Sequence, residues 1–310
     1  MIFEPQIDSG LIKDLAVAVV GYGNQGRAHA LNLRDSGIKV TVGAREGRGR
    51  NWALDDGFEP TDIQIAVQYA DVVVMTVPDE QMKPVFDGLV GPWLKHNATL
   101  LFAHGFAVVY EEIVPPFGAV LVSPAGPGKA VRDSYVEGGG VVAYVAAEPA
   151  TLMPLAKSYG SAIGSSRVGL IPTTFREEVE CDLFGEQVVL CGGMPLLALE
   201  AYASLVKAGY SRDVAHHECV AQIRLLADLM ATRGLMGMWD GISDTAEWGA
   251  LTVGPKIVSE EVKLAMSSAL DRVRSGEFAR EWIAEARSGK PNLDALRKSA
   301  TDRLAELGLD

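Results

Sequence analysis

Three glycines near the start of the chain have the spacing of a phosphate-binding turn. They lie in the run Gly21-Tyr22-Gly23-Asn24-Gln25-Gly26, which follows the apolar stretch Ala16–Val20 and opens a helical pattern. The first glycine permits a tight turn, the second lets backbone approach a pyrophosphate, and the third lets helix and strand pack closely. An ordinary strand-to-helix turn is the alternative. We interpret the whole run as a dinucleotide-binding turn.

Arginines dominate the segment after the second predicted strand. A carboxylate that binds the ribose of NAD is expected there, but the chain reads Gly43-Ala44-Arg45-Glu46-Gly47-Arg48-Gly49-Arg50. Guanidinium groups bind phosphate oxygens through paired hydrogen bonds, so Arg45, Arg48 and Arg50 favour a 2′-phosphate, and therefore NADPH over NADH. A solvated basic loop is the alternative.

Two more segments follow predicted strands, at the edge where ligands of such sheets bind. The first is Pro78-Asp79-Glu80-Gln81, in which Pro78, Asp79 and Gln81 are candidate cofactor contacts. The second contains His104, which could donate a proton or bind a substrate or cofactor. A structural role for this histidine is the alternative.

Carboxylates recur at helical spacing in the second half of the chain. Glu178, Asp182 and Glu186 are four residues apart and share one helix face. Such a stripe repels itself unless a cation binds it, and oxygen ligands suit Mg²⁺. A solvated acidic face is an equal alternative on spacing alone. Glu218 and Gln222 form a second pair at the same interval.

Bulk properties limit the classes of protein. The chain has 310 residues and a formal net charge of -12, which argues against nucleic acid as a partner. Three cysteines without a CxxC pattern suit a reduced thiol pool. The N-terminus lacks a signal-peptide pattern, and no continuous apolar stretch reaches the length of a membrane span. We therefore expect a cytoplasmic protein with no membrane partner.

Strand-like and helical segments alternate up to about residue 171. This alternation predicts a doubly wound α/β sheet of the Rossmann type. The helical segments between its strands include Gln25–Ser36 and Asp62–Tyr69. The predicted strands are Ala16–Val20, Lys39–Val42, Val72–Thr76, Thr99–Phe102, Ala119–Ser123 and Gly140–Val145.

Strand signals almost vanish after Pro172. We predict an all-helical second domain, with the chain divided into residues 1–176 and 177–310. Helix starts are expected at Ser211, Ser259 and Asp294, whose side chains can cap a helix. The predicted helices are Glu177–Val189, Met194–Ala208, Ser211–Arg233, Asp244–Thr252, Ser259–Ser275 and Phe278–Ser288.

Several longer motifs resemble those of ketol-acid reductoisomerase of the short, bacterial type, over nearly the whole chain. The resemblance implies a Rossmann domain followed by a knotted helical domain. It also implies homo-oligomers, as dimers or multiples of dimers, with sites completed by a partner subunit. The motifs are Gly21–Gly37, Pro78–Gln81, Phe102–Phe106, Thr173–Glu178, Asp182–Gln187, Leu190–Gly193 and Ser243–Gly249.

In that family Mg²⁺ assists an alkyl migration in 2-acetolactate, and NADPH then reduces the rearranged keto acid, a step of branched-chain amino-acid biosynthesis. The resemblance implies roles for individual residues here. Asp182 and Glu186 match metal ligands, with Asp182 as the bridge, and Glu218 matches a ligand of a second metal. Glu178 and His104 match active-site residues, and Ser243 matches a hydroxyl that binds substrate.

Two departures from the family pattern bear on the reaction. The family sequence Pro-Lys-Gly-Pro-Gly is Pro124-Ala125-Gly126-Pro127-Gly128 here, so an active-site lysine is replaced by Ala125. Lys129 lies nearby but need not reach the same point. A family glutamate is replaced by Gln222, so one Mg²⁺ site is expected and a second should bind poorly or not at all.

These departures affect alkyl migration more than hydride transfer. We predict a divergent member, suited to specialised metabolism, that reduces a carbonyl or imine of a small polar acid with NADPH and has weakened or lost migration. An ordinary ketol-acid reductoisomerase is the first alternative. A non-catalytic dinucleotide-binding protein is the second, and the retained His104, Glu178, Asp182, Glu186 and Ser243 weigh against it.

Overall fold

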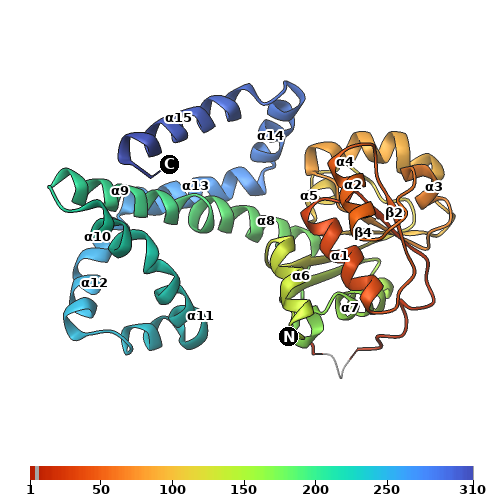
Figure 1. The fold of residues 1–310 in the computed structure, drawn as a ribbon, viewed down its shortest axis with the longest axis horizontal. Coiled ribbons are helices and arrows are strands. Elements are labelled where there is room, and N and C mark those ends of the chain that lie inside the picture. The colour runs from red at the N-terminus through yellow and green to blue at the C-terminus, as the bar shows by residue number, and fades with distance from the viewer. Residues whose placement is uncertain (4–6, 310) are drawn as a thin grey trace. The chain divides into compact units, whose positions relative to one another are not determined.

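The computed structural model describes residues 1–3 and 7–309 and divides into two compact units (Figure 1). The first unit is Met1–Val179 and the second is Glu180–Asp310. The division falls inside helix α8 (Phe175–Gly185), so one helix contributes residues to both units.

The first unit contains a seven-stranded sheet in the order β2-β1-β3-β4-β5-β6-β7. The first five strands in this order are parallel, whereas β6 pairs antiparallel with β5 and parallel with β7. The six predicted strands are confirmed, and β7 was missed because it is a three-residue strand ending in proline. The strands are β1 (Val17–Val20), β2 (Val40–Gly43), β3 (Val72–Met75), β4 (Thr99–Phe102), β5 (Ala119–Pro124), β6 (Ala143–Glu148) and β7 (Leu170–Pro172).

Both faces of this sheet are covered, as its unbroken apolar strands require. In β1, Val17 and Val19 face one hydrophobic cluster, and Ala18 and Val20 face another. Helices α1, α2 and α7 supply the first cluster, and α3, α4 and α5 supply the second. The sheet is therefore a doubly wound, Rossmann-like sheet, as the sequence predicts.

Short helical elements surround the sheet. The α-helices of this unit before α8 are α1 (Asn24–Asp35), α2 (Arg48–Asp55), α3 (Ile63–Val67), α4 (Asp79–Val85), α5 (Phe106–Val109), α6 (Gly128–Val136) and α7 (Met153–Ala162). The remaining turns are a π-helix, η2 (Phe86–Val90), and three 3₁₀ helices, η3 (Gly91–Trp93), η4 (Ala150–Leu152) and η5 (Ser165–Arg167).

The second unit is helical throughout its described residues. Two of its segments are π-helical, with one residue more per turn than an α-helix. The expected helix Ser211–Arg233 is divided by one of them. The elements are η6 (Glu186–Leu190), α9 (Gly193–Lys207), α10 (Arg212–His216), η7 (His217–Ala221), α11 (Ile223–Trp239), α12 (Asp244–Ile257), α13 (Glu260–Arg274), α14 (Glu277–Arg287) and α15 (Pro291–Leu307).

The predicted helix starts agree with the structure at two of three positions. Ser211 accepts a hydrogen bond from the Val214 amide, as predicted. Ser259 occupies the cap position of α13, but its hydroxyl binds Glu261 instead. The expected start at Asp294 is wrong, because α15 begins at Pro291, whose fixed φ suits the first helical position.

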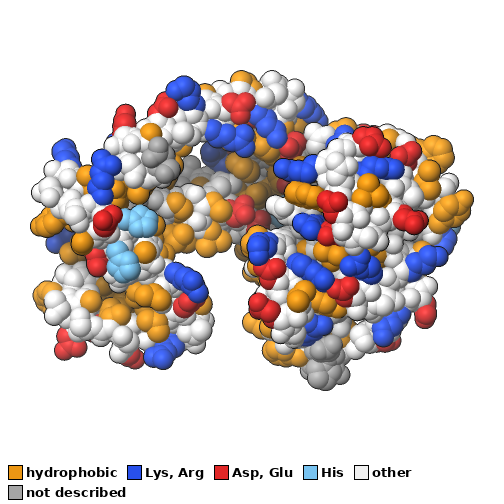
Figure 2. Space-filling model, viewed as in Figure 1, with side chains coloured by type: hydrophobic (Ala, Val, Ile, Leu, Met, Phe, Trp, Pro, Cys, Tyr) orange, Lys and Arg blue, Asp and Glu red, His pale blue; other side chains and the backbone are white. Residues whose placement is uncertain are grey.

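Few side chains of the helical unit are buried within it. Its small core contains Tyr202, Ala215 and Leu307, whereas large apolar side chains such as Trp248 and Leu264 are about 70% exposed (72% and 69%). Figure 2 shows apolar side chains over much of the visible surface of its helices. The helices of this unit therefore leave an extensive apolar surface uncovered by one another.

One continuous helical run, Phe175–Lys207, is long and apolar enough to cross a membrane by length and composition alone. It joins α8, η6 and α9, and 11% of its most apolar window is buried. From the sequence, no continuous apolar stretch of membrane-span length is expected. This run nevertheless meets a criterion based on mean hydropathy, which allows a few charged residues among the apolar ones. Exposed apolar surface of this kind also suits a protein contact.

Candidate cofactor and active site

The glycine turn has the geometry that its sequence predicts. Gly21 has a φ of +92°, and a Cβ there would lie 2.8 Å from the side chain of Val77. A Cβ on Gly26 would lie 2.2 Å from the Gly21 carbonyl oxygen, so only glycine allows α1 to start this close to β1. Thr76 holds the turn by donating its hydroxyl to the Gly21 oxygen at 2.9 Å. Sequence reasoning missed this threonine, although it directly follows the buried strand β3.

The space in front of the turn suits a dinucleotide. A Cβ on Gly23 would meet no atom within 4 Å, and α1 begins at Asn24 without a side-chain cap. Open space and uncapped amide groups at a helix amino end are what a pyrophosphate requires. The residues of this turn therefore fit a nicotinamide dinucleotide.

Tyr22 and Gln25 of the turn contact the protein through their side chains. The Tyr22 hydroxyl donates to Asp56, which also binds Arg27, and burial raises the pKa of the Tyr22 phenol. Gln25 donates through Nε2 to the Gly126 carbonyl oxygen at 2.9 Å. These two side chains brace the turn, and the Oε1 atom of Gln25 keeps no hydrogen-bond partner among the described residues.

The three arginines of the following loop do not act as one group. Arg50 donates to the Ala44 carbonyl oxygen at 2.9 Å and pairs with Glu46 and Asp62. Arg45 is exposed, and the Arg48 guanidinium lies 4.8 Å from the centre of the Trp52 ring. Arg45 and Arg48 form no ion pair with any residue that the structure describes. The loop thus presents two cations, and Arg50 braces it.

The segment after β3 lies at the expected edge of the sheet. Pro78 is the cap residue of α4, which starts at Asp79, and the Gln81 amide donates to the Pro78 oxygen at 2.8 Å. Since β3 pairs directly with β1, this segment and the glycine turn follow the carboxyl ends of neighbouring strands.

His104 and Glu178 form a hydrogen-bonded pair in which the carboxylate is buried and the imidazole is partly exposed. The Glu178 side chain is fully buried and lies 2.9 Å from Nδ1 of His104, and it also accepts from the Gly105 amide at 3.0 Å. An ionised carboxylate only accepts, so it favours the histidine tautomer with a proton on Nδ1. The pair resembles the carboxylate–histidine arrangements that orient a proton-transferring imidazole.

Gly105 explains how α8 comes so close to this histidine. A Cβ on Gly105 would lie 2.9 Å from the side chain of Val179 and 3.2 Å from Glu178. The Phe102 and Phe175 rings pack edge to face beside it. The His-Gly pair after β4 is therefore a docking point for the first turns of α8.

The three carboxylates at helical spacing, Glu178, Asp182 and Glu186, differ in their environments. Glu178 is buried in the first unit, whereas Asp182 and Glu186 are exposed in the second. No three histidine, cysteine or acidic side chains of the described chain lie close enough to hold a metal together. Asp182 and Glu186 remain one helical turn apart, and two carboxylates with water and substrate suit Mg²⁺.

The second proposed ligand pair lies on a π-helical turn. Glu218 is exposed within η7, and Gln222 is partly buried just after it. Glu186 is the first residue of another π-helical turn, η6. Such turns are rare and are frequent at functional sites. Ser243 is the cap of α12 and accepts from the Ala246 amide at 3.3 Å, which leaves its hydroxyl proton for a ligand.

Ala125 lies on an exposed position of a rigid loop. Its amide donates to the Val142 oxygen at 2.8 Å, and a Cβ on the nearby Gly128 would lie 2.1 Å from the Asn24 oxygen. Lys129 is 86% exposed and pairs with Asp133 on its own helix, so its ammonium is directed along α6.

Comparisons with known proteins agree with this geometry. Residues 11–169 match the family described as acetohydroxy acid isomeroreductase, NADPH-binding domain, and residues 175–309 match ketol-acid reductoisomerase, C-terminal domain. An NADH-preferring ketol-acid reductoisomerase from an uncultured archean is 37% identical, with a TM-score of 0.93, over 99% of this chain and 96% of that one.

Two more distant structures share the fold. A semialdehyde dehydrogenase NAD-binding protein from Cupriavidus necator is 17% identical over 84% of this chain and 99% of that one, with a TM-score of 0.66. A pyrroline-5-carboxylate reductase from Coxiella burnetii is 16% identical over 84% and 97%, with a TM-score of 0.60.

The sheet, the glycine turn and these matches define an NAD(P)-dependent oxidoreductase. Both family domains together span almost the whole chain. The chain belongs to the ketol-acid reductoisomerase family.

Proposed function

We propose that this protein uses NADPH to reduce a carbonyl or imine of a small polar acid, and that its alkyl-migration step is weakened or lost. The observation that carries the proposal is the loop at Ala125, which presents a methyl group where the family has an ammonium. Lys129, the nearest lysine along the chain, pairs with Asp133 instead. Without that cation, less charge is available to stabilise the alkoxide of a migrating substrate.

Reduction makes smaller demands on the protein. When bound, NADPH supplies the hydride, and the protein must position the cofactor and protonate the oxygen or nitrogen that receives it. The glycine turn performs the first task. His104, oriented by the buried Glu178 carboxylate, is suited to the second.

NADPH is the proposed cofactor because two cations of the loop carry no ion pair within the described chain. Arg45 and Arg48 flank the amino end of α2, where a 2′-phosphate would gain charge-assisted hydrogen bonds. The archaeal relative is NADH-preferring, whereas the matched family domain is described as NADPH-binding, so cofactor preference varies within the family.

Mg²⁺ is the proposed metal, at one site. Asp182 and Glu186 would hold it, and the ion would polarise the substrate oxygens. Gln222 offers a neutral amide beside Glu218, so a second ion would bind weakly or not at all.

A second copy of the chain is the proposed partner. The helical unit buries few apolar side chains around Tyr202 and leaves large ones such as Trp248 exposed, and its candidate ligands Asp182, Glu186 and Glu218 are exposed in a single chain. A dimer, or a multiple of dimers, would cover this surface and complete the ligand set.

The proposal is tested by separating the two half-reactions. Purified protein is given NADPH and Mg²⁺ with either 2-acetolactate or 3-hydroxy-3-methyl-2-ketobutyrate, the already rearranged keto acid. We expect turnover of the second substrate and little of the first. The double variant Ala125→Lys with Gln222→Glu should then raise the acetolactate rate, with Lys129→Met as the control that leaves both rates unchanged.

Other outcomes favour the alternatives. Fast turnover of acetolactate by the unmodified protein would contradict the proposal and identify an ordinary reductoisomerase. Binding of NADPH without reduction of either substrate, or of a panel of small keto and imino acids, would favour a non-catalytic dinucleotide-binding protein.

A further inference from the structure

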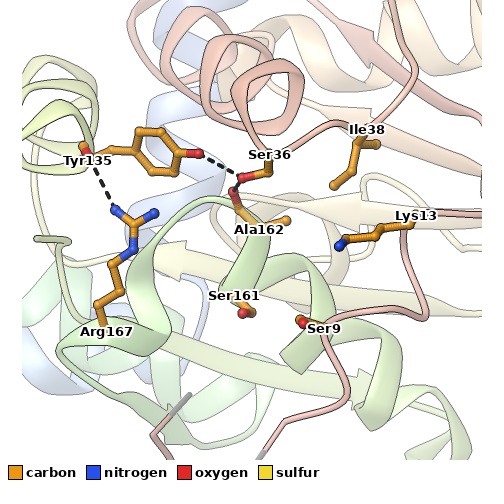
Figure 3. Close-up of a pocket in the computed structure, with 8 residues that line it drawn as sticks. All are labelled: Ser9, Lys13, Ser36, Ile38, Tyr135, Ser161, Ala162 and Arg167. Atoms are coloured by element: carbon orange, nitrogen blue, oxygen red, sulfur yellow. Dashed lines mark hydrogen bonds between the residues drawn. The ribbon is translucent and has the colours of Figure 1, made fainter. Parts of the chain in front are cut away.

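A pocket lies at the opposite edge of the α/β unit from the glycine turn (Figure 3). It adjoins the amino ends of β1 and β2, whereas the glycine turn follows the carboxyl end of β1. Its volume is about 280 Å³, enough for a small molecule. We call it the amino-edge pocket, and its polar lining consists of Ser9, Lys13, Ser36, Tyr135, Ser161 and Arg167.

The lining carries two cations, and none of the eight residues drawn in Figure 3 is acidic. The Lys13 amide donates to the Gly10 carbonyl oxygen, but its side chain has no hydrogen bond or ion pair with any described residue. Arg167 donates through Nη1 to the carbonyl oxygens of Tyr135 at 3.2 Å and Gly139 at 3.0 Å, which leaves Nη2 without a partner in the described chain. The nearby Asp35 is held by Arg132 at 2.6 Å. A cationic pocket in a protein of net charge -12 favours an anion.

One hydroxyl in the pocket wall is also available to a ligand. The Ser161 residue is only 7% exposed and lines the pocket, and its hydroxyl has no hydrogen-bond partner among the residues that the structure describes. A serine hydroxyl can donate one hydrogen bond. An acceptor oxygen inside the pocket would satisfy it.

The wall beside these groups is rigid. The Ser36 hydroxyl lies 2.7 Å from the Tyr135 hydroxyl and donates to the Ala162 oxygen at 2.6 Å, as the dashed lines in Figure 3 show. The Arg167 guanidinium lies 4.4 Å from the centre of the Tyr135 ring. A preformed wall lowers the entropy cost of binding.

We propose that the amino-edge pocket binds a small oxyanion of the phosphate type. Lys13 supplies a point charge, Arg167 supplies its remaining guanidinium nitrogen, and Ser161 donates a hydrogen bond. The site is distinct from the cofactor site and does not rest on the proposed reaction. Its ligand joins the segment before β1 to the ends of α1 and α7, so binding stabilises the α/β unit.

The test is titration calorimetry of the full chain with inorganic phosphate, and separately with acetate, at constant ionic strength. Lys13→Met should weaken phosphate binding at least about tenfold, because a charged hydrogen-bond partner is lost. Ser161→Ala should weaken it by a smaller factor. Lys298→Met, which removes an exposed lysine paired with Asp302 on α15, is the matched control and should leave phosphate binding unchanged.

The Lys13 side chain makes no contact with a described polar partner, so its variant is expected to fold, and a thermal melt checks this. Acetate binding that Lys13→Met also weakens would support the oxyanion site and assign it to carboxylates as well. Absence of phosphate and acetate binding at millimolar concentration would overturn the proposal. Binding that survives Lys13→Met unchanged would overturn it equally, since the ion would then lie elsewhere.

Discussion

At the scale of single residues, charged side chains that lie close together in the sequence have different partners in the structure. Arg45, Arg48 and Arg50 are nearly equivalent in sequence, yet Arg50 is bound to Glu46, Asp62 and a carbonyl oxygen. A guanidinium already paired in this way has little left for a cofactor phosphate. Arg45 and Arg48 are therefore the residues of the loop proposed to bind the cofactor phosphate, whereas Arg50 holds the loop in place.

This separation predicts the effects of two substitutions. Arg48→Met should raise the KM for NADPH about tenfold while that for NADH changes little, because only NADPH carries the 2′-phosphate. Arg50→Met should weaken both cofactors similarly, through loss of loop structure. Steady-state kinetics with each cofactor measures this, and an equal effect of Arg48→Met on both would contradict the assignment.

Glu178 is predicted to act as a positioning residue for His104. Glu178→Gln should lower kcat about a hundredfold with a smaller change in KM, since an amide does not select one histidine tautomer. Nitrogen chemical shifts of the His104 ring should show the loss of a single tautomer. Glu177→Gln is the control, because the Glu177 carboxylate lies at the surface, where it accepts a hydrogen bond from Thr173. An unchanged tautomer in the Glu178 variant would argue against this role.

At the scale of elements, local signals predict local structure well. The unbroken valine run of β3 and the glycine pattern before α1 determine their elements almost alone. The pairing of His104 with Glu178, 74 residues apart, was not predictable from the sequence, because it depends on how closely Gly105 lets α8 approach. The π-helical turns were also missed, since a helical pattern does not reveal an added residue per turn.

The contact between α1 and α6 gives a prediction about one glycine. Gly128→Ala would place a Cβ 2.1 Å from the Asn24 oxygen, so the two helix starts must separate. We expect a loss of about 1–3 kcal/mol in unfolding free energy and weaker dinucleotide binding. Gly88→Ala is the matched control, because nothing lies within 4 Å of its added Cβ. Denaturant unfolding of both variants measures the unfolding free energy, and cofactor titration measures the dinucleotide affinity.

The contact between α1 and α7 contains a buried titratable pair. His29 is fully buried with Nδ1 2.9 Å from the Tyr159 hydroxyl, and burial lowers the pKa of its imidazole from 6.5 to about 4. Between these pH values the unfolded chain binds the proton and the folded chain does not. Stability is therefore full above about pH 6.5 and falls as pH decreases, by about 3 kcal/mol once pH is below 4.

Urea unfolding over this pH range measures the loss. Because other groups titrate at low pH, the informative quantity is the difference between the protein and its His29→Gln variant, which has no imidazole to protonate. The difference should shrink or reverse as pH falls from 6.5 to 4. Parallel stability curves for the two proteins would contradict a buried neutral histidine.

At the scale of the whole molecule, the two units differ in how completely they bury their apolar side chains. The α/β unit covers both faces of its sheet, whereas the helical unit leaves Trp248 at 72% exposure and Leu251 at 49%. The sequence predicts the second unit to be helical but not this exposure, because helical periodicity does not say what covers a face. Burial by another copy would lower the free energy of the assembly.

The proposed dimer predicts a contrast between two tryptophans. Trp248→Glu in the helical unit should shift the protein toward monomers in sedimentation experiments and lower its melting temperature, since a charge would lie in the apolar contact. Trp93→Glu in the α/β unit, at 48% exposure, should leave the assembly intact. A protein that sediments as a monomer without substitution would contradict the dimer.

The attachment of the Ala125 loop to the glycine turn has a consequence for how such an enzyme diverges. Gln25 donates to the loop backbone, and Gly128 lets the loop pack against Asn24, so the course of the loop is set by contacts with the glycine turn rather than by the side chain at position 125. A substitution at position 125 therefore changes one side chain and leaves the backbone of the loop in place. The chemistry of the pocket can therefore change in one evolutionary step, while the apparatus for hydride transfer is inherited intact.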